Sequence, residues 1–264
     1  MRSIGWFGAG WLTLLAGGSA AAELPVDLEL ILAVDVSGSM DAGEQALQRQ
    51  GYIEAFLHPE LAAAVRSGPY GRIVVTYVEW GGHHAQQVTV AWTLIDGGSA
   101  ADDFAADLAE APPARLRGTS ISGVLLFAAP LFEGNGFDGL RRVIDISGDG
   151  PNNIGPPVVP ARDAALAAGI VVNGLPLELD ARNPIGMGRR SLADYYRDCV
   201  IGGPGAFVLP VTATDQMREA IRRKLVLEIA GLPARLVPAA ETGPSAGADC
   251  LVGERIRRDW LRDP

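Results

Sequence analysis

The sequence predicts an α/β fold with a doubly wound, mostly parallel central sheet, helices on both of its faces and one antiparallel edge strand. Residues 28–34 form an almost continuous apolar run, which is typical of a central strand buried on both faces. Strand-like and helix-like stretches then alternate, with connections long enough for parallel pairing. Residues 81–84, by contrast, form a link short enough for a hairpin, so the strand that follows is expected at an antiparallel edge.

A helix is expected directly after the first strand, at residues 41–56, because apolar side chains recur there on one helical stripe. Asp41 can cap this helix, and Glu44 stands three residues later, as in a capping box. His58 and Pro59 are expected to end it, since a proline disfavours helix in the residue before it.

The remaining segments are expected to alternate in the same way. Further strands are expected at residues 72–80, 86–92, 141–147, 170–175 and 206–209. Further helices are expected at residues 101–111, 121–131, 160–168 and 191–199, and at residues 214–229 with Thr214 or Asp215 as the cap. The acids of the helix at 101–111 are interpreted as its solvated face: Asp102, Asp103, Asp107 and Glu110.

The N-terminus resembles an export signal. Arg2 precedes an apolar core at residues 4–15, and the small residues 20–22 fit a cleavage site. We expect residues 1–22 to be a signal peptide cleaved after Ala22, and a periplasmic or secreted protein without a stable membrane span. An uncleaved anchor stays open as the alternative, although the apolar core is short for a membrane span.

Residues 23–231 are expected to form the folded domain, and residues 232–264 a partly ordered tail rich in proline and glycine with a short helix at 254–261. The two cysteines, Cys199 and Cys250, would close a loop of about 50 residues if they were bridged. Two buried thiols remain the alternative, because a sequence does not supply the geometry of a disulfide.

Composition limits the classes of function. The chain has 264 residues, 48% of them hydrophobic, which suffices for a large core and excludes wholesale disorder. Its formal net charge of −9 argues against nucleic acid or an anionic membrane surface as the partner of the whole molecule.

Three loops rich in side-chain oxygens are expected at strand–helix junctions of the predicted sheet. They are Asp35-x-Ser37-x-Ser39, Gly118-Thr119-Ser120 and the turn at residues 147–150. Any one of them alone would be read as ordinary helix capping. Together, and in this order, they indicate a site at the carboxyl edge of the sheet, where open α/β folds bind ligands.

The donors in these loops indicate a hard cation. Two serine hydroxyls, a threonine hydroxyl and two carboxylates would converge without a nearby imidazole or thiolate, which favours Mg²⁺, Ca²⁺ or Mn²⁺ over zinc. If the carboxylates act largely through water, the cation stays under-neutralised and attracts an acidic oxygen from outside.

These residues resemble the metal-ion-dependent adhesion site of von Willebrand factor A-type domains. In that family a D-x-S-x-S loop, a threonine of a later loop and an aspartate after the fourth strand hold one metal. The matching positions are Asp35, Ser37, Ser39, Thr119 and Asp149. The resemblance implies that they hold Mg²⁺, with Ca²⁺ or Mn²⁺ as alternatives, and that a protein or peptide partner completes the site with an acidic side chain.

The resemblance covers residues 25–231 and is greatest to a bacterial group of exported A-type proteins. One departure is Ser147-Gly148-Asp149, where the family more often has a threonine directly before the aspartate. We therefore expect an exported binding module that captures a partner carboxylate through a divalent cation. A periplasmic assembly factor or complex subunit that docks through the same site is the alternative, and an ion that only pins the loops together is a third.

Catalysis is not expected. A phosphotransferase of the haloacid-dehalogenase type would place its general acid where this chain has Ser37. A serine hydrolase is not indicated either, because Ser37 does not lie in a Gly-x-Ser-x-Gly elbow. The glycine-rich residues 202–205 are not followed by the Gly-Lys-Ser/Thr of a phosphate-binding loop. The adjacent His83 and His84 lie in a glycine-flanked turn and are expected to be solvated rather than bound to a transition metal.

Overall fold

A computed structural model describes residues 22–179, 190–231 and 247–262. The expected export signal, except for its last residue, lies outside the described residues, and so do residues 232–246 of the expected tail. Five strands form the central sheet in the order β4-β3-β2-β6-β7, and only β4 is antiparallel to its neighbour. These strands are β2 (Glu29–Asp35), β3 (Ile73–Trp80), β4 (Gln86–Ile95), β6 (Arg142–Gly148) and β7 (Ile170–Pro176).

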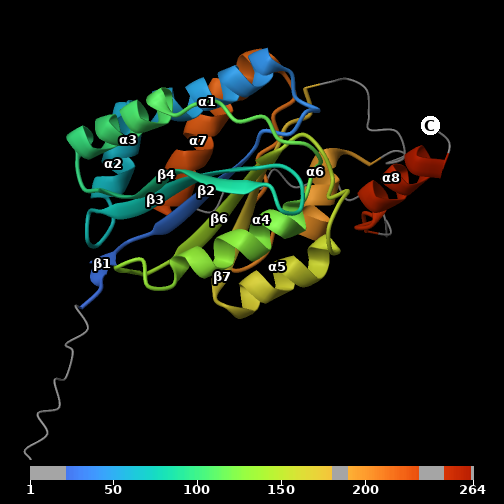
Figure 1. Cartoon of the computed structure of the whole chain (residues 1–264). Helices are drawn as coiled ribbons and strands as arrows, with labels where there is room; N and C mark the ends of the chain where they lie inside the picture. The colour runs from blue at the N-terminus through green and yellow to red at the C-terminus, as the bar shows by residue number, and fades with distance from the viewer. Residues whose placement is uncertain (1–21, 180–189, 232–246, 263–264) are drawn as a thin grey trace, which may run out of the picture.

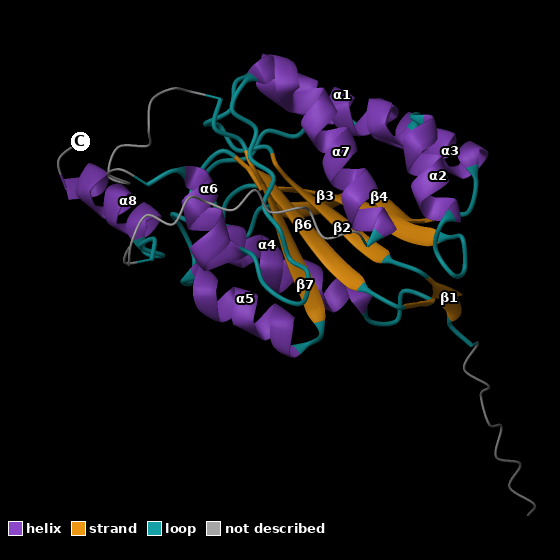
Figure 2. Cartoon of the chain, turned by 180° about the vertical axis from the view of Figure 1, so that it is seen from behind, coloured by secondary structure: helices purple, strands orange, loops and turns teal. Residues whose placement is uncertain are grey.

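Helices cover both faces of this sheet (Figures 1 and 2). One face packs against α1 (Ala42–Phe56), α2 (Pro59–Arg66), α3 (Gly98–Glu110) and α7 (Met217–Ala230). The other packs against α4 (Ile121–Ala128), α5 (Val158–Ala167), α6 (Leu192–Tyr195) and the π-helical turn Tyr196–Val200 that continues α6. The expected doubly wound α/β architecture is therefore confirmed.

The central strand β2 explains why the sheet has two cores. Leu30, Leu32 and Val34 contribute to the core under α1 and α7, whereas Ile31 and Ala33 contribute to the core over α4 and α5. All seven residues of β2 are buried, because the strand lies between β3 and β6 and is covered on both faces.

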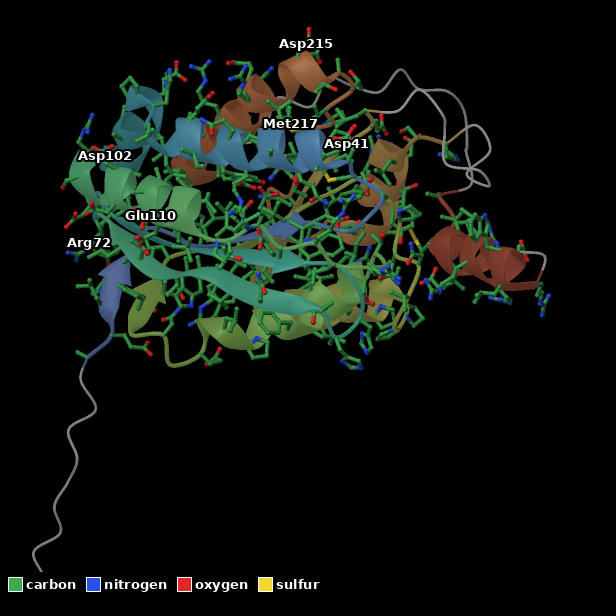
Figure 3. All side chains as sticks on the ribbon, turned by 45° about the horizontal axis from the view of Figure 1, so that its top comes forward. Asp41, Arg72, Asp102, Glu110, Asp215 and Met217 are labelled. Atoms are coloured by element: carbon green, nitrogen blue, oxygen red, sulfur yellow. A yellow bond between two sulfur atoms is a disulfide. The ribbon has the colours of Figure 1, made fainter. Side chains whose placement is uncertain are left out.

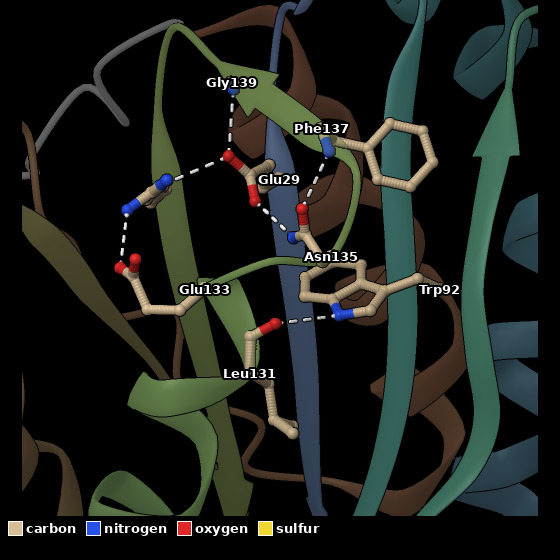
Figure 4. Close-up of polar contacts among 8 residues, drawn as sticks. Glu29, Trp92, Leu131, Glu133, Asn135, Phe137 and Gly139 are labelled. Atoms are coloured by element: carbon tan, nitrogen blue, oxygen red, sulfur yellow. Dashed lines mark hydrogen bonds and ion pairs between the residues drawn. The ribbon is translucent and has the colours of Figure 1, made fainter. Parts of the chain in front are cut away.

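Two short parallel strands, β1 (Leu24–Val26) and β5 (Phe137–Gly139), close the amino end of the sheet. Beside them lies the buried carboxylate of Glu29, which accepts hydrogen bonds from Asn135 Nδ2 at 2.6 Å, Gly139 N at 2.9 Å and Arg142 Nε at 3.2 Å (Figure 4). Both oxygens of this carboxylate are thus bound by protein donors.

Several expectations about helices are confirmed. Asp41 caps α1 through the backbone amides of Gly43 and Glu44, and the Glu44 side chain accepts from Asp41 N, which completes the expected capping box. The acids of α3 are exposed, including Asp102 and Glu110 (Figure 3).

Other expectations were wrong in detail. Pro59 ends α1 but also starts the short helix α2, whose cap is His58, because a proline is tolerated in the first turn of a helix. Residues 206–209 form no strand. They meet β7 through an isolated bridge between Gly174 and Val208 and through Phe207 N, which donates to Asn173 Oδ1 at 3.0 Å, and Pro210 follows directly.

The start of α7 also differs from the expectation. Thr214 and Asp215 belong to a 3₁₀ turn, Thr214–Gln216, that precedes α7, and neither side chain caps the helix. A second 3₁₀ turn, Ala129–Phe132, follows α4, so the helix expected at residues 121–131 is a helix and a tighter turn.

The C-terminal helix α8 (Val252–Arg262) begins earlier than expected and lies beyond α6, at one end of the molecule (Figure 1). Cys199 and Cys250 form a disulfide, which decides between the two alternatives that the sequence left open. Within the described residues, no helix combines the length and apolar character needed to cross a bilayer.

Candidate metal centre

The expected site lies at the carboxyl ends of β2 and β6, the two neighbouring central strands. Asp35 is the last residue of β2, and Asp149 directly follows β6. The loop before α4 joins them because Ser37 pairs with Leu116, whose amide donates to Val36 O at 3.0 Å. Parallel strands place their carboxyl ends at one edge, so residues far apart in sequence meet here.

A chain of hydrogen bonds links four of the five predicted residues. Asp35 Oδ1 accepts from the backbone amide of Ser37 at 2.7 Å. The hydroxyls of Ser37 and Ser39 are 2.9 Å apart, and Ser39 Oγ donates to Asp149 Oδ1 at 2.8 Å. The first and third loops are therefore in direct contact through their side-chain oxygens.

Thr119 comes from the second loop and is buried. A methyl group built on Gly150 would lie 3.9 Å from Thr119 Oγ1, which places the hydroxyl next to the loop that carries Asp149. The backbone of Thr119 is held by Asn153. The side-chain oxygen of Asn153 accepts from Thr119 N at 3.1 Å, and its backbone amide donates to Thr119 O at 2.9 Å.

The electrostatics of the site are unfavourable for a pair of bare carboxylates. Burial raises the pKa of Asp35 well above its usual value, and the nearby charge of Asp149 raises it further. Burial also raises the pKa of Asp149, although the hydrogen bond from Ser39 opposes this. Two carboxylates held together in a desolvated site need either protons or a cation.

Asp35 Oδ2 is the clearest sign of what the site needs. The residue is fully buried, yet this oxygen accepts no hydrogen bond from any described residue. Glu29, on the same strand and equally buried, has partners for both of its oxygens. Buried polar atoms in native proteins are almost always satisfied, so an unpartnered carboxylate oxygen calls for a specific explanation such as an ion.

The donor set fits a hard divalent cation. It consists of two carboxylates and three hydroxyls, which are oxygen ligands of the kind that Mg²⁺, Ca²⁺ and Mn²⁺ prefer. A zinc site built on imidazoles and thiolates would need several His or Cys side chains together. Among the described residues there is no cluster of three or more His, Cys, Asp or Glu side chains. His83 and His84 stack on each other, with ring centroids 4.2 Å apart.

Two residues at the site, Gln45 and Tyr196, were missed by the sequence reasoning. Gln45 donates from Nε2 to Ser37 O at 2.9 Å and so holds the first loop. The hydroxyl of Tyr196 is buried without a partner among the described residues, and a methyl group on Gly148 would lie 3.0 Å from both this hydroxyl and Asp35 Oδ2. No sequence signal identified Tyr196. The glycine before Asp149 was a signal, since it departs from the usual threonine.

Comparison with known proteins gives a family match for most of the chain. Residues 25–233 match the family described as "Protein of unknown function (DUF1194)". No curated protein matches the chain in sequence.

Solved structures share the fold at low sequence identity. Proximal thread matrix protein 1 from the mussel byssus, in a structure with a zinc-occupied MIDAS motif, superposes with a TM-score of 0.58 at 16% identity, covering 80% of this chain and 49% of that one. A von Willebrand factor type A protein from Catenulispora acidiphila gives 0.51 at 14% identity, covering 77% and 43%. BatB from Bacteroides thetaiotaomicron gives 0.50 at 19% identity, covering 77% and 99%. The chain thus spans about half the length of the mussel protein.

Proposed function

The chain belongs to the DUF1194 family and has a von Willebrand factor A-type fold, and we propose that it is an exported binding module that captures a partner's acidic side chain through a divalent cation. The observation that supports this most directly is the buried Oδ2 of Asp35, which has no hydrogen-bond partner among the described residues, in a loop whose serine hydroxyls reach the carboxylate of Asp149. The expected signal peptide supports export, and the domain of residues 23–231 is the binding unit.

Asp35, Ser37, Ser39, Thr119 and Asp149 are the proposed ligands, and Mg²⁺ is the proposed cation, with Ca²⁺ or Mn²⁺ as alternatives. The bound cation supplies a centre of positive charge at the surface edge of the site. Ser39 is exposed and Asp149 half-buried, so this side of the site is open to an incoming oxygen. Three of the five donors are neutral hydroxyls, so if these bind directly and the two carboxylates act largely through water, the cation keeps positive charge that attracts a partner carboxylate.

The rim of the site favours an acidic partner as well. Arg115 and Arg117 are exposed and flank Leu116, the residue that pairs with Ser37. Both are positive side chains next to the loop of Ser37, in a chain whose net charge is −9. Positive side chains near a binding site increase the rate of encounter with acidic ligands.

An affinity experiment with the full mature chain tests this function. The wild type and Asp35→Ala are immobilised in Mg²⁺, exposed to exported proteins of the source organism, and eluted with a chelator. A partner recovered from the wild type is then purified, and its acidic residues are changed one by one to amides. Asp102→Asn, on the exposed face of α3, is the matched control for loss of a carboxylate.

The proposal predicts binding that needs Mg²⁺, that is lost in Asp35→Ala and kept in Asp102→Asn, and that a single amide substitution in the partner abolishes. Capture that survives both the chelator and Asp35→Ala would contradict it. Recovery of one defined multi-subunit complex would favour the assembly-factor alternative. A marked fall in the melting temperature of Asp35→Ala in Mg²⁺, with no partner bound by either protein, would favour an ion that only pins the loops.

A further inference from the structure

Helix α8 lies outside the residues matched by the family, yet it packs directly against the loop that carries Asp149. Val252 and Gly253 in its first turn are buried, whereas the residues of its last turns are exposed. Gly253 is so close to Asn152 that a methyl group built on it would lie 2.1 Å from the Asn152 carbonyl oxygen. The first turn of α8 is therefore fitted to this loop.

A covalent bond attaches the start of α8 to the other side of the site. Cys250 is bonded to Cys199 in the π-helical turn after α6, and Ala248 N donates to Asp198 Oδ2 at 2.6 Å. The same turn contains Tyr196, whose hydroxyl lies next to Asp35 across Gly148. Single π-helical turns occur frequently at functional sites.

Asn152 connects α8 to two of the proposed metal-binding loops. Its side chain donates to Glu254 Oε1 in α8 at 2.7 Å and to Pro156 O at 3.1 Å. Its side-chain oxygen accepts from the backbone amide and the hydroxyl of Ser122, at 3.0 and 3.1 Å. The backbone amide of Asn152 donates to the hydroxyl of Tyr195 at 3.2 Å. Asn152 is fully buried, so the hydrogen bonds of its side chain constrain the orientation of the side-chain amide.

These bonds connect two segments that each carry a proposed ligand. Asn152 is three residues from Asp149, and Ser122 is three residues from Thr119. The neighbouring Asn153 holds the backbone of Thr119 from the same loop. A shift of Asn152 would therefore change the separation between the loop of Thr119 and the loop of Asp149.

We propose that α8 is a brace for the metal centre: Glu254 and the Cys199–Cys250 disulfide act as positioning elements that hold Asn152 and thereby set the cation affinity of the site. This inference rests on the proposed function. Residues that orient metal ligands from outside typically change metal affinity about 10–100-fold when they are replaced. Glu254 acts through Asn152, so the low end of that range is expected.

The test compares the full mature chain with Glu254→Ala, with Cys250→Ser and with Asp259→Ala, an exposed acid of the same helix that serves as the matched control. Mg²⁺ affinity is measured by calorimetry on protein that circular dichroism shows to be folded. Amide hydrogen exchange of residues 118–122 and 149–154 is measured on the metal-free proteins, which reports the loops independently of any cation.

The brace predicts that Glu254→Ala and Cys250→Ser bind Mg²⁺ about tenfold more weakly than the wild type and exchange faster in both loops, while Asp259→Ala changes neither. Unchanged affinity and unchanged exchange in Glu254→Ala would overturn it. A lower melting temperature with full Mg²⁺ affinity would also overturn it, since α8 would then only stabilise the fold. If the wild type itself binds no Mg²⁺, the proposed function fails, and the exchange of the metal-free loops still decides whether α8 positions them.

Discussion

Two carboxylates on one strand have different surroundings. Glu29 and Asp35 stand at opposite ends of β2, and both are fully buried. Glu29 is satisfied by an asparagine, a backbone amide and an arginine, so it serves the structure of the amino end (Figure 4). Asp35 has an oxygen without a hydrogen-bond partner in the described part of the chain, and its pKa is raised, so it is suited to bind a cation.

Cation affinity is predicted to rise with pH. Burial, and the charge of Asp149, raise the pKa of Asp35 in the metal-free protein, and burial raises that of Asp149. A cation binds the deprotonated carboxylates, so binding must displace protons, and each displaced proton changes the affinity up to about tenfold per pH unit. Calorimetric titrations of Mg²⁺ at several pH values between about 5 and 8, in buffers of different ionisation enthalpy, measure the protons released. Affinity that is flat over this range would contradict the raised pKa values.

Gly148 is predicted to be required for the shape of the site. A methyl group there would lie 3.0 Å from Asp35 Oδ2, 3.0 Å from the hydroxyl of Tyr196 and 3.2 Å from Asp35 Cβ. Gly148→Ala should therefore lower the free energy of unfolding by about 1–3 kcal/mol, as overpacking does, and weaken Mg²⁺ binding.

Gly150→Ala is the matched control, because it changes the other neighbour of Asp149. The added methyl group would meet only Thr119, at 3.9 Å, which is ordinary contact. Denaturant unfolding and Mg²⁺ calorimetry on both variants measure the difference. Equal behaviour of the two alanine variants would contradict the explanation.

At the scale of elements, α7 shows how a helix can be anchored by buried charge. Lys224 and Glu228 lie on its inner face and are almost fully buried, together with Asp145 of β6. Lys224 forms ion pairs with both acids, and Asn173 of β7 donates to Glu228 Oε1 at 2.9 Å. Replacing Lys224 with an apolar residue would leave both acids buried without their cation.

Glu228 is predicted to make stability depend on pH. Burial, and the charge of Asp145, raise its pKa from 4.5 to about 7, although Lys224 opposes this. A carboxyl with a raised pKa holds its proton more tightly in the folded than in the unfolded state. Its contribution is therefore complete below pH 4.5 and is lost as the pH rises through about 7, by roughly 3 kcal/mol in total.

Denaturant unfolding of the metal-free protein at pH values from about 5 to 8 measures this effect. Glu228→Gln keeps the size of the side chain and should flatten the decline relative to the wild type. Asp102→Asn, an exposed acid of α3, should leave the decline unchanged (Figure 3). Parallel curves for the wild type and Glu228→Gln would contradict the assignment.

The elements with strong local signals could be predicted from the sequence. β2 was recognised from its apolar run and α1 from its capping box, because each signal is contained in a few consecutive residues. The helix α2 was missed because Pro59 was interpreted only as a stop. Residues 206–209 looked like a strand because of their composition, but pairing depends on neighbours that a local pattern does not contain.

The candidate site was predictable for a related reason. The residues proposed as its ligands fall into three short patterns, and the rule that parallel strands share one carboxyl edge brings them together. The contribution of Tyr196, Asn152 and α8 could not be predicted, since it depends on contacts across about 50 to 100 residues and on the disulfide.

At the scale of the whole molecule, the two ends of the sheet differ in structure and in proposed role. The amino end is closed by β1, β5 and the satisfied carboxylate of Glu29. The carboxyl end holds the five proposed ligands in loops that hydrogen bonds and the contact with α8 connect. A cation that binds the folded state alone also stabilises it, by about 2.7 kcal/mol when its concentration is one hundred times its dissociation constant.

The central claim is that Asp35 and its neighbours hold one divalent cation, and calorimetric titration of the metal-stripped mature protein tests it most directly. Mg²⁺, Ca²⁺, Mn²⁺ and Zn²⁺ are titrated into the wild type, into Asp35→Ala and into Glu133→Gln, a control at the opposite end of the sheet (Figure 4). The account predicts binding of one Mg²⁺ per chain by the wild type and by Glu133→Gln, and none by Asp35→Ala. Absence of binding by the wild type at millimolar metal, or equal binding by Asp35→Ala, would contradict it.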